Sequence, residues 1–215
     1  MKTTESKSGR PRGRPLSFDR DTVLERAMHL FWQKGYESTT VHDLTLAMGI
    51  TAPSLYSAFG DKEQLYLEAV ERYRSNAGEY ACDFLDQHPT ARDAVRALMI
   101  DACVSMTDPD TPTGCMLVNS AATAAVASPR VQEAVSQCRQ AAQTDLTRRI
   151  ERGIREGDVP AHVNASMLAR FYVTVLTGIA IQSREGLTCA DMRAVIESAM
   201  QAWPSVTTSD VAQPA

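Results

Sequence analysis

Arginine alternates with glycine and proline near the start of the chain, in the segment GRPRGRP at residues 9–15. Residues 1–17 contain almost nothing apolar, so we expect a flexible arm that cannot fold alone. On such an arm Arg10, Arg12 and Arg14 can enter the minor groove of A·T-rich DNA, where negative potential is concentrated. The alternative is a solubilising tail, and the pattern that follows residue 17 favours the DNA role.

The cysteines are the next side chains whose chemistry could carry a function. Their odd number and wide spacing, without a CxxC pair, indicate neither a disulfide framework nor a zinc site. One of them, Cys115, follows a glycine at the predicted start of a helix, where the dipole favours the thiolate. The alternative is a small packing residue, because no Lys, Arg or His lies within several positions of it. The five are Cys82, Cys103, Cys115, Cys138 and Cys189.

No motif supports an enzyme. The four histidines are scattered and pair with no Cys or carboxylate at metal-ligand spacing, and the sequence lacks a P-loop, GxSxG, HExxH or GxGxxG. We therefore expect no catalytic residues, no metal and no cofactor.

Charge is unevenly distributed along the chain. The net charge is −4, yet residues 1–16 hold five basic residues and one acidic residue. Residues 75–215 carry an acidic excess. A basic arm joined to an acidic body indicates two different tasks.

Apolar spacing predicts an all-α fold of about nine helices, with no alternating strand pattern. Asp19 and Asp21 lie near the N-terminal dipole of the first helix, and the candidate caps of the next three are Thr39 or Thr40, Thr51 and Asp61. No run of about 20 apolar residues and no apolar signal region is apparent, so we expect a cytoplasmic protein without a membrane partner. The expected helices cover 19–34, 40–48, 52–58, 61–89, 95–106, 116–127, 131–156, 164–184 and 188–203.

The stretch MGITAPSLYSAFGDKEQLY, residues 48–66, joins two short helices through Gly49. A glycine turn followed by a Thr cap is typical of a helix-turn-helix. Leu55 and Phe59 lie four positions apart and should anchor the second helix, while Tyr56 faces outward. The alternative is two packed core helices, which rarely combine an outward Tyr with a capped, Pro-started turn.

Residues 18–66 resemble the N-terminal DNA-binding domain of the TetR family of bacterial repressors. The matching features are Lys34-Gly35-Tyr36, Thr39-Thr40-Val41, Met48-Gly49-Ile50, Leu55-Tyr56, Phe59 and Lys62-Glu63. The resemblance implies phosphate contacts from Thr40, Thr51, Tyr56 and Lys62. It places Ala52, Pro53, Ser54 and Ser57 near base edges. The arm is similar to an AT-hook.

Composition predicts a basic arm at 1–17 and a disordered tail at 205–215, and the resemblance implies a DNA-binding domain at 18–64 and an effector-binding and dimerisation domain at 65–204. Gly114 to Asn119 looks like a motif in a branch of the family, some of whose members sense electrophiles or oxidants through this cysteine. Ligand-cavity candidates are Tyr80, Phe84, Met99, Cys103, Met106, Cys115, Met116, Asn119, Phe171 and Tyr172. The alternative is that the apolar members of this set simply fill the core. Dimer-interface candidates are Tyr172, Val175, Leu176, Ile179, Val195, Ile196 and Ala199.

These expectations describe a homodimeric repressor of a palindromic operator in double-stranded DNA, released by an unknown small-molecule effector or by thiol modification. The alternative is a helical small-molecule or partner-binding protein that has lost operator binding. Such a protein has no reason to carry the basic arm.

Overall fold

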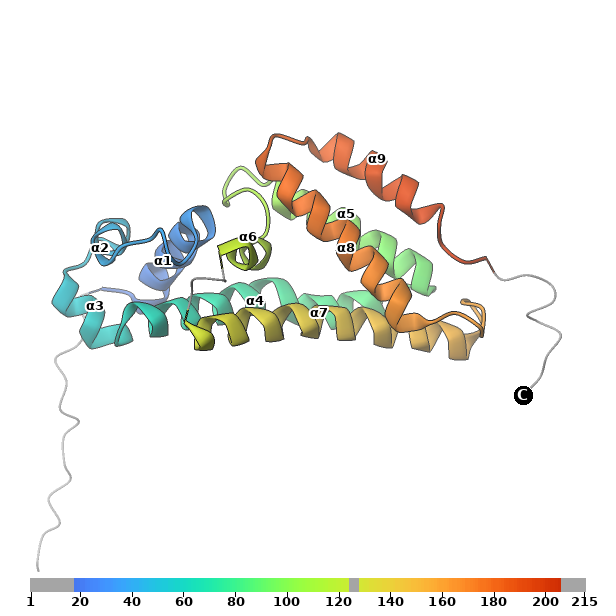
Figure 1. Cartoon of the computed structure of the whole chain (residues 1–215), viewed down its shortest axis with the longest axis horizontal. Coiled ribbons are helices and arrows are strands. Elements are labelled where there is room, and N and C mark those ends of the chain that lie inside the picture. Colours follow the sequence, from blue (N-terminus) through green and yellow to red (C-terminus); the bar gives the residue numbers. More distant parts are fainter. Residues whose placement is uncertain (1–17, 124–127, 206–215) are drawn as a thin grey trace, which may run out of the picture.

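The computed structural model describes residues 18–123 and 128–205, except for the side chains of 77–83 and 121–123. Within these ranges the chain is helical and contains no strand, as predicted. The molecule is elongated, with three short helices at one end and a larger helical body at the other (Figure 1). The three short helices are α1 (Arg20–Lys34), α2 (Val41–Met48) and α3 (Ala52–Phe59).

Side-chain caps begin the first four helices, and those of the second to fourth lie where the sequence predicted them. Asp19 accepts from the backbone N–H of Thr22, and Thr40 rather than Thr39 caps α2. Thr51 caps α3, and the Asp61 carboxylate accepts from Gln64 at the start of α4 (Lys62–Asp86). These short bonds satisfy N–H groups that the first turn of a helix leaves unpaired.

The body contains α5 (Ala91–Met106), α6 (Met116–Thr123), α7 (Pro129–Glu156), α8 (Ala165–Arg184) and α9 (Cys189–Met200). The two long helices α4 and α7 lie side by side along the base of the molecule, and α8 crosses above them (Figure 1). The last helix ends at Met200 instead of the predicted Trp203. The indole of Trp203 turns back onto the ring of Tyr172, with centroids 5.5 Å apart.

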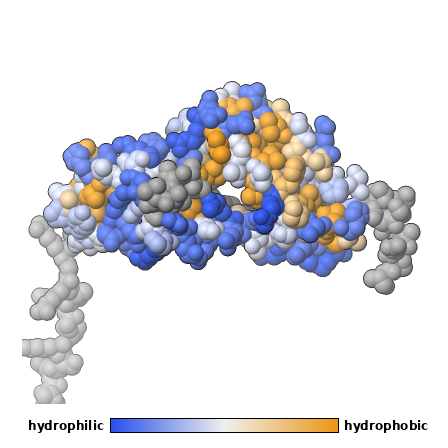
Figure 2. Space-filling view, in the orientation of Figure 1, coloured by the Kyte–Doolittle hydropathy of each residue, from blue (hydrophilic) through white to orange (hydrophobic). Residues whose placement is uncertain are grey.

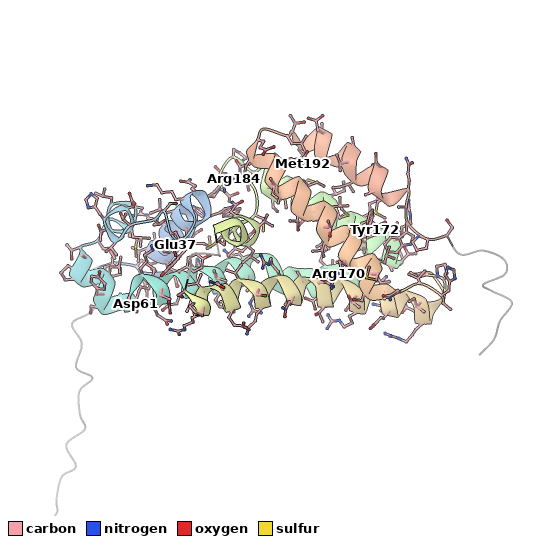
Figure 3. All side chains as sticks on the ribbon, in the orientation of Figure 1. Glu37, Asp61, Arg170, Tyr172, Arg184 and Met192 are labelled. Carbon is pink, nitrogen blue, oxygen red and sulfur yellow. The ribbon has the colours of Figure 1, made fainter. Side chains whose placement is uncertain are left out.

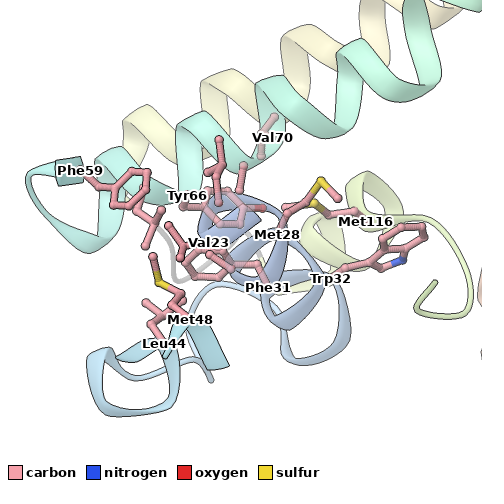
Figure 4. Packing of buried hydrophobic residues seen from close by; sticks show 14 of the residues in the cluster. Val23, Met28, Phe31, Trp32, Leu44, Met48, Phe59, Tyr66, Val70 and Met116 are labelled. Atoms are coloured by element: carbon pink, nitrogen blue, oxygen red, sulfur yellow. The ribbon is translucent and has the colours of Figure 1, made fainter. Parts of the chain in front are cut away.

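Two cores hold the ends of the molecule together. In the first, α1 packs on α4, and Phe31 meets the edge of the Tyr66 ring at 5.0 Å between centroids (Figure 4). Met116 of α6 also belongs to this core, which therefore crosses from the small helices into the body. The second core lies among α5, α7, α8 and α9 and centres on Met99, Ile150 and Met192.

Polar bonds close the junction between the two ends. The side-chain amide of Asn119 on α6 donates to the carbonyl of Trp32 at 3.3 Å. Arg184, at the end of α8 (Figure 3), donates to the carbonyl of Gln33 at 3.1 Å. Both donors satisfy carbonyls in the last turn of α1, so α6 and α8 hold that end of the helix.

Helix α8 meets a membrane-span criterion that we expected no segment to meet. Its 20 residues are long and apolar enough to cross a bilayer by length and composition. That criterion alone is weak, because core helices of soluble proteins also satisfy it. One face of α8 is buried, with Ala169, Tyr172 and Ala180 packed inside the chain.

Candidate functional site

Helix α3 presents an exposed face at the end of the molecule. Leu55 and Phe59 are buried, as predicted, and fix the inner side of the helix. On the outer side Pro53 and Ser57 are exposed and Ala52 and Ser54 are half-buried, while Tyr56 keeps 51% of its surface exposed. The sequence-predicted contact residues of α3 thus share one accessible face.

The turn between α2 and α3 fixes the angle of this face. Gly49 adopts a left-handed conformation with φ of 69°, which a residue with a Cβ rarely takes. After the turn, the hydroxyls of Thr51 and Ser54 lie 3.0 Å apart, and the Ser54 N–H donates to Thr51 at 3.4 Å. The start of α3 is therefore rigid, with its remaining N–H groups available to an anion.

The start of α2 differs from a simple anion site. Thr40 and Asp43 form a capping box, in which the Thr40 hydroxyl donates to the Asp43 carboxylate at 2.7 Å. These bonds, together with Lys34 at 3.1 Å, hold the pKa of Asp43 well below its usual range. Thr40 is exposed, but its hydroxyl must turn away from Asp43 before it can donate to a phosphate.

Lys62, at the first position of α4, lies over the Tyr36 ring with its Nζ 4.3 Å from the centroid. Partial burial lowers the pKa of Lys62, and the charge of Glu37 opposes that shift. The cation–π contact restrains the ammonium group of Lys62 near the start of the helix.

Our sequence analysis missed His42. It is exposed in the first turn of α2, next to Thr40, and its imidazole belongs to the same end of the molecule as the α3 face. The signal available in the sequence was the position of His42 in the first helical turn, two residues after the predicted cap Thr40. Arg10, Arg12 and Arg14 lie outside the described residues.

A cavity of about 420 Å³ lies in the body of the molecule, among α4, α5, α6, α7 and α8. The surface is visibly hollowed there, between α8 and the long base helices (Figure 2). Its walls are mostly apolar, with a charged edge made by Glu71, Arg74 and Asp145. Further lining residues are Tyr73, Ser75, Leu85, Leu98, Ala102, Leu117, Cys138, Ala141, Ala142, Leu146 and Leu176.

Among the predicted cavity residues whose side chains the structure describes, none lies in this wall. Met99, Cys103 and Met116 are fully buried in the two cores, where they are packed against other core residues. Phe171 points outward and is 42% exposed. Phe84, Met106, Asn119 and Tyr172 lie elsewhere, and the side chain of Tyr80 lies outside the described residues.

Comparisons with known proteins agree with this geometry. Residues 23–69 match the model for "Bacterial regulatory proteins, tetR family", and residues 89–202 match the model for "Tetracyclin repressor-like, C-terminal domain". The chain belongs to the TetR family. It is a DNA-binding transcriptional repressor of that family, whose members are transcriptional regulators.

Two relatives of this TetR-family chain align over nearly their whole length. The HTH-type transcriptional repressor ComR of Escherichia coli is 30% identical over 196 residues, covering 91% of this chain and 93% of ComR. The repressor BdcR of the same organism is 27% identical over 93% of this chain and 96% of BdcR. A solved structure of the TetR-family regulator CifR, a cysteine mutant bound to 26-base-pair operator DNA, is 40% identical with a TM-score of 0.84. The alignment covers 89% of this chain and all of that one.

In this TetR-family chain Cys115 lies just before α6, at the junction between the two cores. The Tyr73 hydroxyl donates to Cys115 Sγ at 3.4 Å, and the Tyr73 ring meets Trp32 at 5.0 Å between centroids. The thiol is half-buried. Cys115 is outside the cavity wall, but Tyr73 lines that cavity and connects the two features.

The outer face of α8 forms a shallow apolar groove with α9, lined by Phe171, Thr174, Val175, Gly178, Ile179, Gln182 and Val195. Three of the predicted interface residues, Val175, Ile179 and Val195, belong to it. Tyr172 and Ile196 have no exposed surface because they face the core of their own chain. Leu176 lines the cavity and Ala199 packs against the second core, so neither of these half-buried residues lines the groove.

Proposed function

We propose that this TetR-family chain is a homodimeric repressor that binds a palindromic operator in the cytoplasm. In this proposal it is released by a small molecule in the body cavity or by modification of Cys115. The observation that carries the proposal is the exposed α3 face, held by a capped turn and joined through α4 to a cavity about 420 Å³ in volume.

Operator contact would be shared between the outer face of α3 and the ends of α2 and α4. The small side chains Ala52, Pro53, Ser54 and Ser57 allow close approach to base edges, while Tyr56, Thr51 and Lys62 donate to phosphates. Such a face offers few strong hydrogen bonds to bases. Arg10, Arg12 and Arg14 would supply further affinity and A·T preference from the minor groove.

A dimer is needed to present two α3 helices to successive major-groove faces about 34–36 Å apart. The α8–α9 groove supports such a dimer, because its exposed Phe171 and Val195 form an apolar surface on the body, away from α3.

Release would act through α4. Tyr73 and Leu85 of α4 line the cavity, and Lys62 and Tyr66 of the same helix adjoin the DNA-binding helices. A ligand that fits the cavity only when α4 has shifted favours that state by its difference in affinity. A group attached to Cys115 Sγ would displace the Tyr73 hydroxyl and press on the same helix.

Selection of bound genomic fragments by the purified full chain tests the proposal, repeated after removal of residues 1–16. We expect a palindrome whose A·T-rich flanks matter only when the arm is present. Absence of enrichment at any salt concentration would favour the alternative, a helical binding protein without operator affinity.

A further inference from the structure

Arg149 is a charged side chain that is almost fully buried, and it is the largest such side chain among the described residues. It lies on α7 and is 2% exposed. Its Nε donates to the carbonyl of Leu85 at 3.1 Å, and its Nη2 donates to the carbonyl of His88 at 3.1 Å. Leu85 lies in the last turn of α4 and His88 lies just beyond its end, so the guanidinium group caps the negative end of that helix.

One part of this guanidinium group is left without compensation. Among the described residues, no carboxylate lies within ion-pair distance of Arg149, and its buried Nη1 has no hydrogen-bond partner. A buried charge and a buried donor are both costly when unpaired. The two bonds to carbonyl groups satisfy Nε and Nη2, and Nη1 remains an unsatisfied donor.

Arg149 lines a small pocket of about 160 Å³ at this end of α4. Its wall is basic, and its two carboxylates are already engaged. Asp86 pairs with Arg152 at 3.1 Å, and Asp145 pairs with Arg148 at 3.5 Å. The full set of lining residues is Leu85, Asp86, Asp145, Arg148, Arg149, Arg152 and Arg155.

Arg155 adds a second arginine without a partner carboxylate to the wall of this pocket. It lines the pocket from the last turn of α7 and forms no ion pair with any residue that the structure describes. Two of the arginines that line this pocket, Arg149 and Arg155, therefore make no ion pair with any carboxylate among the described residues. Guanidinium groups bind phosphate, sulfate and carboxylate through paired N–H donors.

We propose that this pocket binds a small oxyanion, with the guanidinium groups of Arg149 and Arg155 as its ligands. The volume holds one tetrahedral oxyanion with a few waters, since liquid water occupies about 30 Å³ per molecule. Leu85 and Asp145 line both this pocket and the larger cavity, so the two adjoin. The oxyanion is either a free inorganic ion or the head group of a ligand whose apolar part occupies the cavity. The site is independent of the proposed DNA function.

The test uses the purified full chain at constant ionic strength, with chloride replaced by inorganic phosphate or sulfate. We expect a saturable rise in Tm with phosphate and a binding isotherm by calorimetry. Arg155→Gln should weaken phosphate binding by about tenfold or more while leaving Tm in chloride unchanged, because Arg155 is exposed and makes no ion pair. The matched control is Arg139→Gln, an exposed arginine on the same helix outside the pocket, which should bind phosphate as the parent does.

Arg149→Met removes both the ligand and the cap of α4, and it should abolish binding if the variant folds. If Arg149→Met does not fold, Arg155→Gln still tests the proposal. Equal Tm values in phosphate, sulfate and chloride would overturn the site, as would unchanged phosphate affinity in Arg155→Gln, and Arg149 would then be a helix cap only. Comparison of acetate with octanoate separates the two sources: equal affinity indicates a free anion, and tighter octanoate indicates the head group of an amphipathic ligand.

Discussion

The Tyr73 hydroxyl on α4 donates a hydrogen bond to the Cys115 thiol before α6, with 3.4 Å between Oη and Sγ. Burial raises the pKa of Tyr73 well above its ordinary value, and the nearby thiol adds to that shift, so the phenol remains a neutral donor. Because Trp32 of α1 packs on the same ring, a change at Cys115 reaches two helices of the DNA-binding end.

This contact predicts that Cys115 is the thiol through which electrophiles weaken DNA binding. Treatment with N-ethylmaleimide should lower operator affinity at least about tenfold, because the adduct cannot keep the Tyr73 contact within a packed junction. Cys115→Ser should remain insensitive, whereas Cys138→Ser, the control in the cavity wall, should respond as the parent does. Cys103 should not react, since burial raises its pKa to about 11. Equal sensitivity of Cys115→Ser and the parent would contradict the prediction.

Tyr56→Phe should weaken operator binding by about 1.5–3 kcal/mol, the value of a hydrogen bond to a charged group. Stability should not change, because the side chain is 51% exposed and its hydroxyl makes no bond within the described chain. Fluorescence anisotropy with labelled operator measures the affinity. Thr144→Ala, at an exposed position on α7, is the control, and unchanged affinity of Tyr56→Phe would remove Tyr56 from the interface.

Lys62→Met should reduce the salt dependence of operator binding. Each phosphate contact contributes about 0.9 to the slope of log affinity against log salt concentration, so a homodimer should lose about two contacts. The apolar Met keeps packing against Tyr36, which separates loss of charge from loss of structure. A slope equal to that of the parent would show that Lys62 does not contact a phosphate.

Asp43→Asn should destabilise the DNA-binding end in a pH-dependent way. The folded pKa of Asp43 is lowered, chiefly by bonds from Thr40, so its contribution is present above the unfolded pKa of about 3.9. That contribution is lost as pH falls through the folded value. The difference in Tm between parent and variant should therefore be constant from pH 7 to about pH 5 and shrink below about pH 4. A difference that does not vary with pH would rule out the charge as its source.

Phe171→Glu should dissociate the proposed dimer, since it buries a charge in the centre of the α8–α9 groove. Sedimentation should report a monomer. Leu46→Glu is the matched control: this apolar side chain on α2 is 69% exposed and lies far from the groove, so the dimer should persist. A dimeric Phe171→Glu would place the interface elsewhere.

The DNA-binding end could be predicted because its determinants are local. Caps at Thr40 and Thr51, the turn at Gly49 and the spacing of Leu55 and Phe59 each act within a few residues. The structure therefore contains the caps and the turn on which the resemblance to the TetR family was based.

The cavity could not be predicted in this way. Large apolar residues such as Met99 and Met116 were expected to line it, but they fill the cores. Space remains where small side chains, Ala141 and Ala142, face a junction of several helices. That depends on how helices distant in sequence meet, which no local pattern encodes.

The faces of α8 show the same division. The sequence determined that α8 is a helix with apolar residues on more than one side, because helical periodicity is a property of a single segment. Only the tertiary structure decided that Tyr172 is buried in its own chain while its neighbour Phe171 is exposed. Adjacent residues on a helix point about 100° apart, and the packing of α5, α7 and α9 selects which direction becomes the interior.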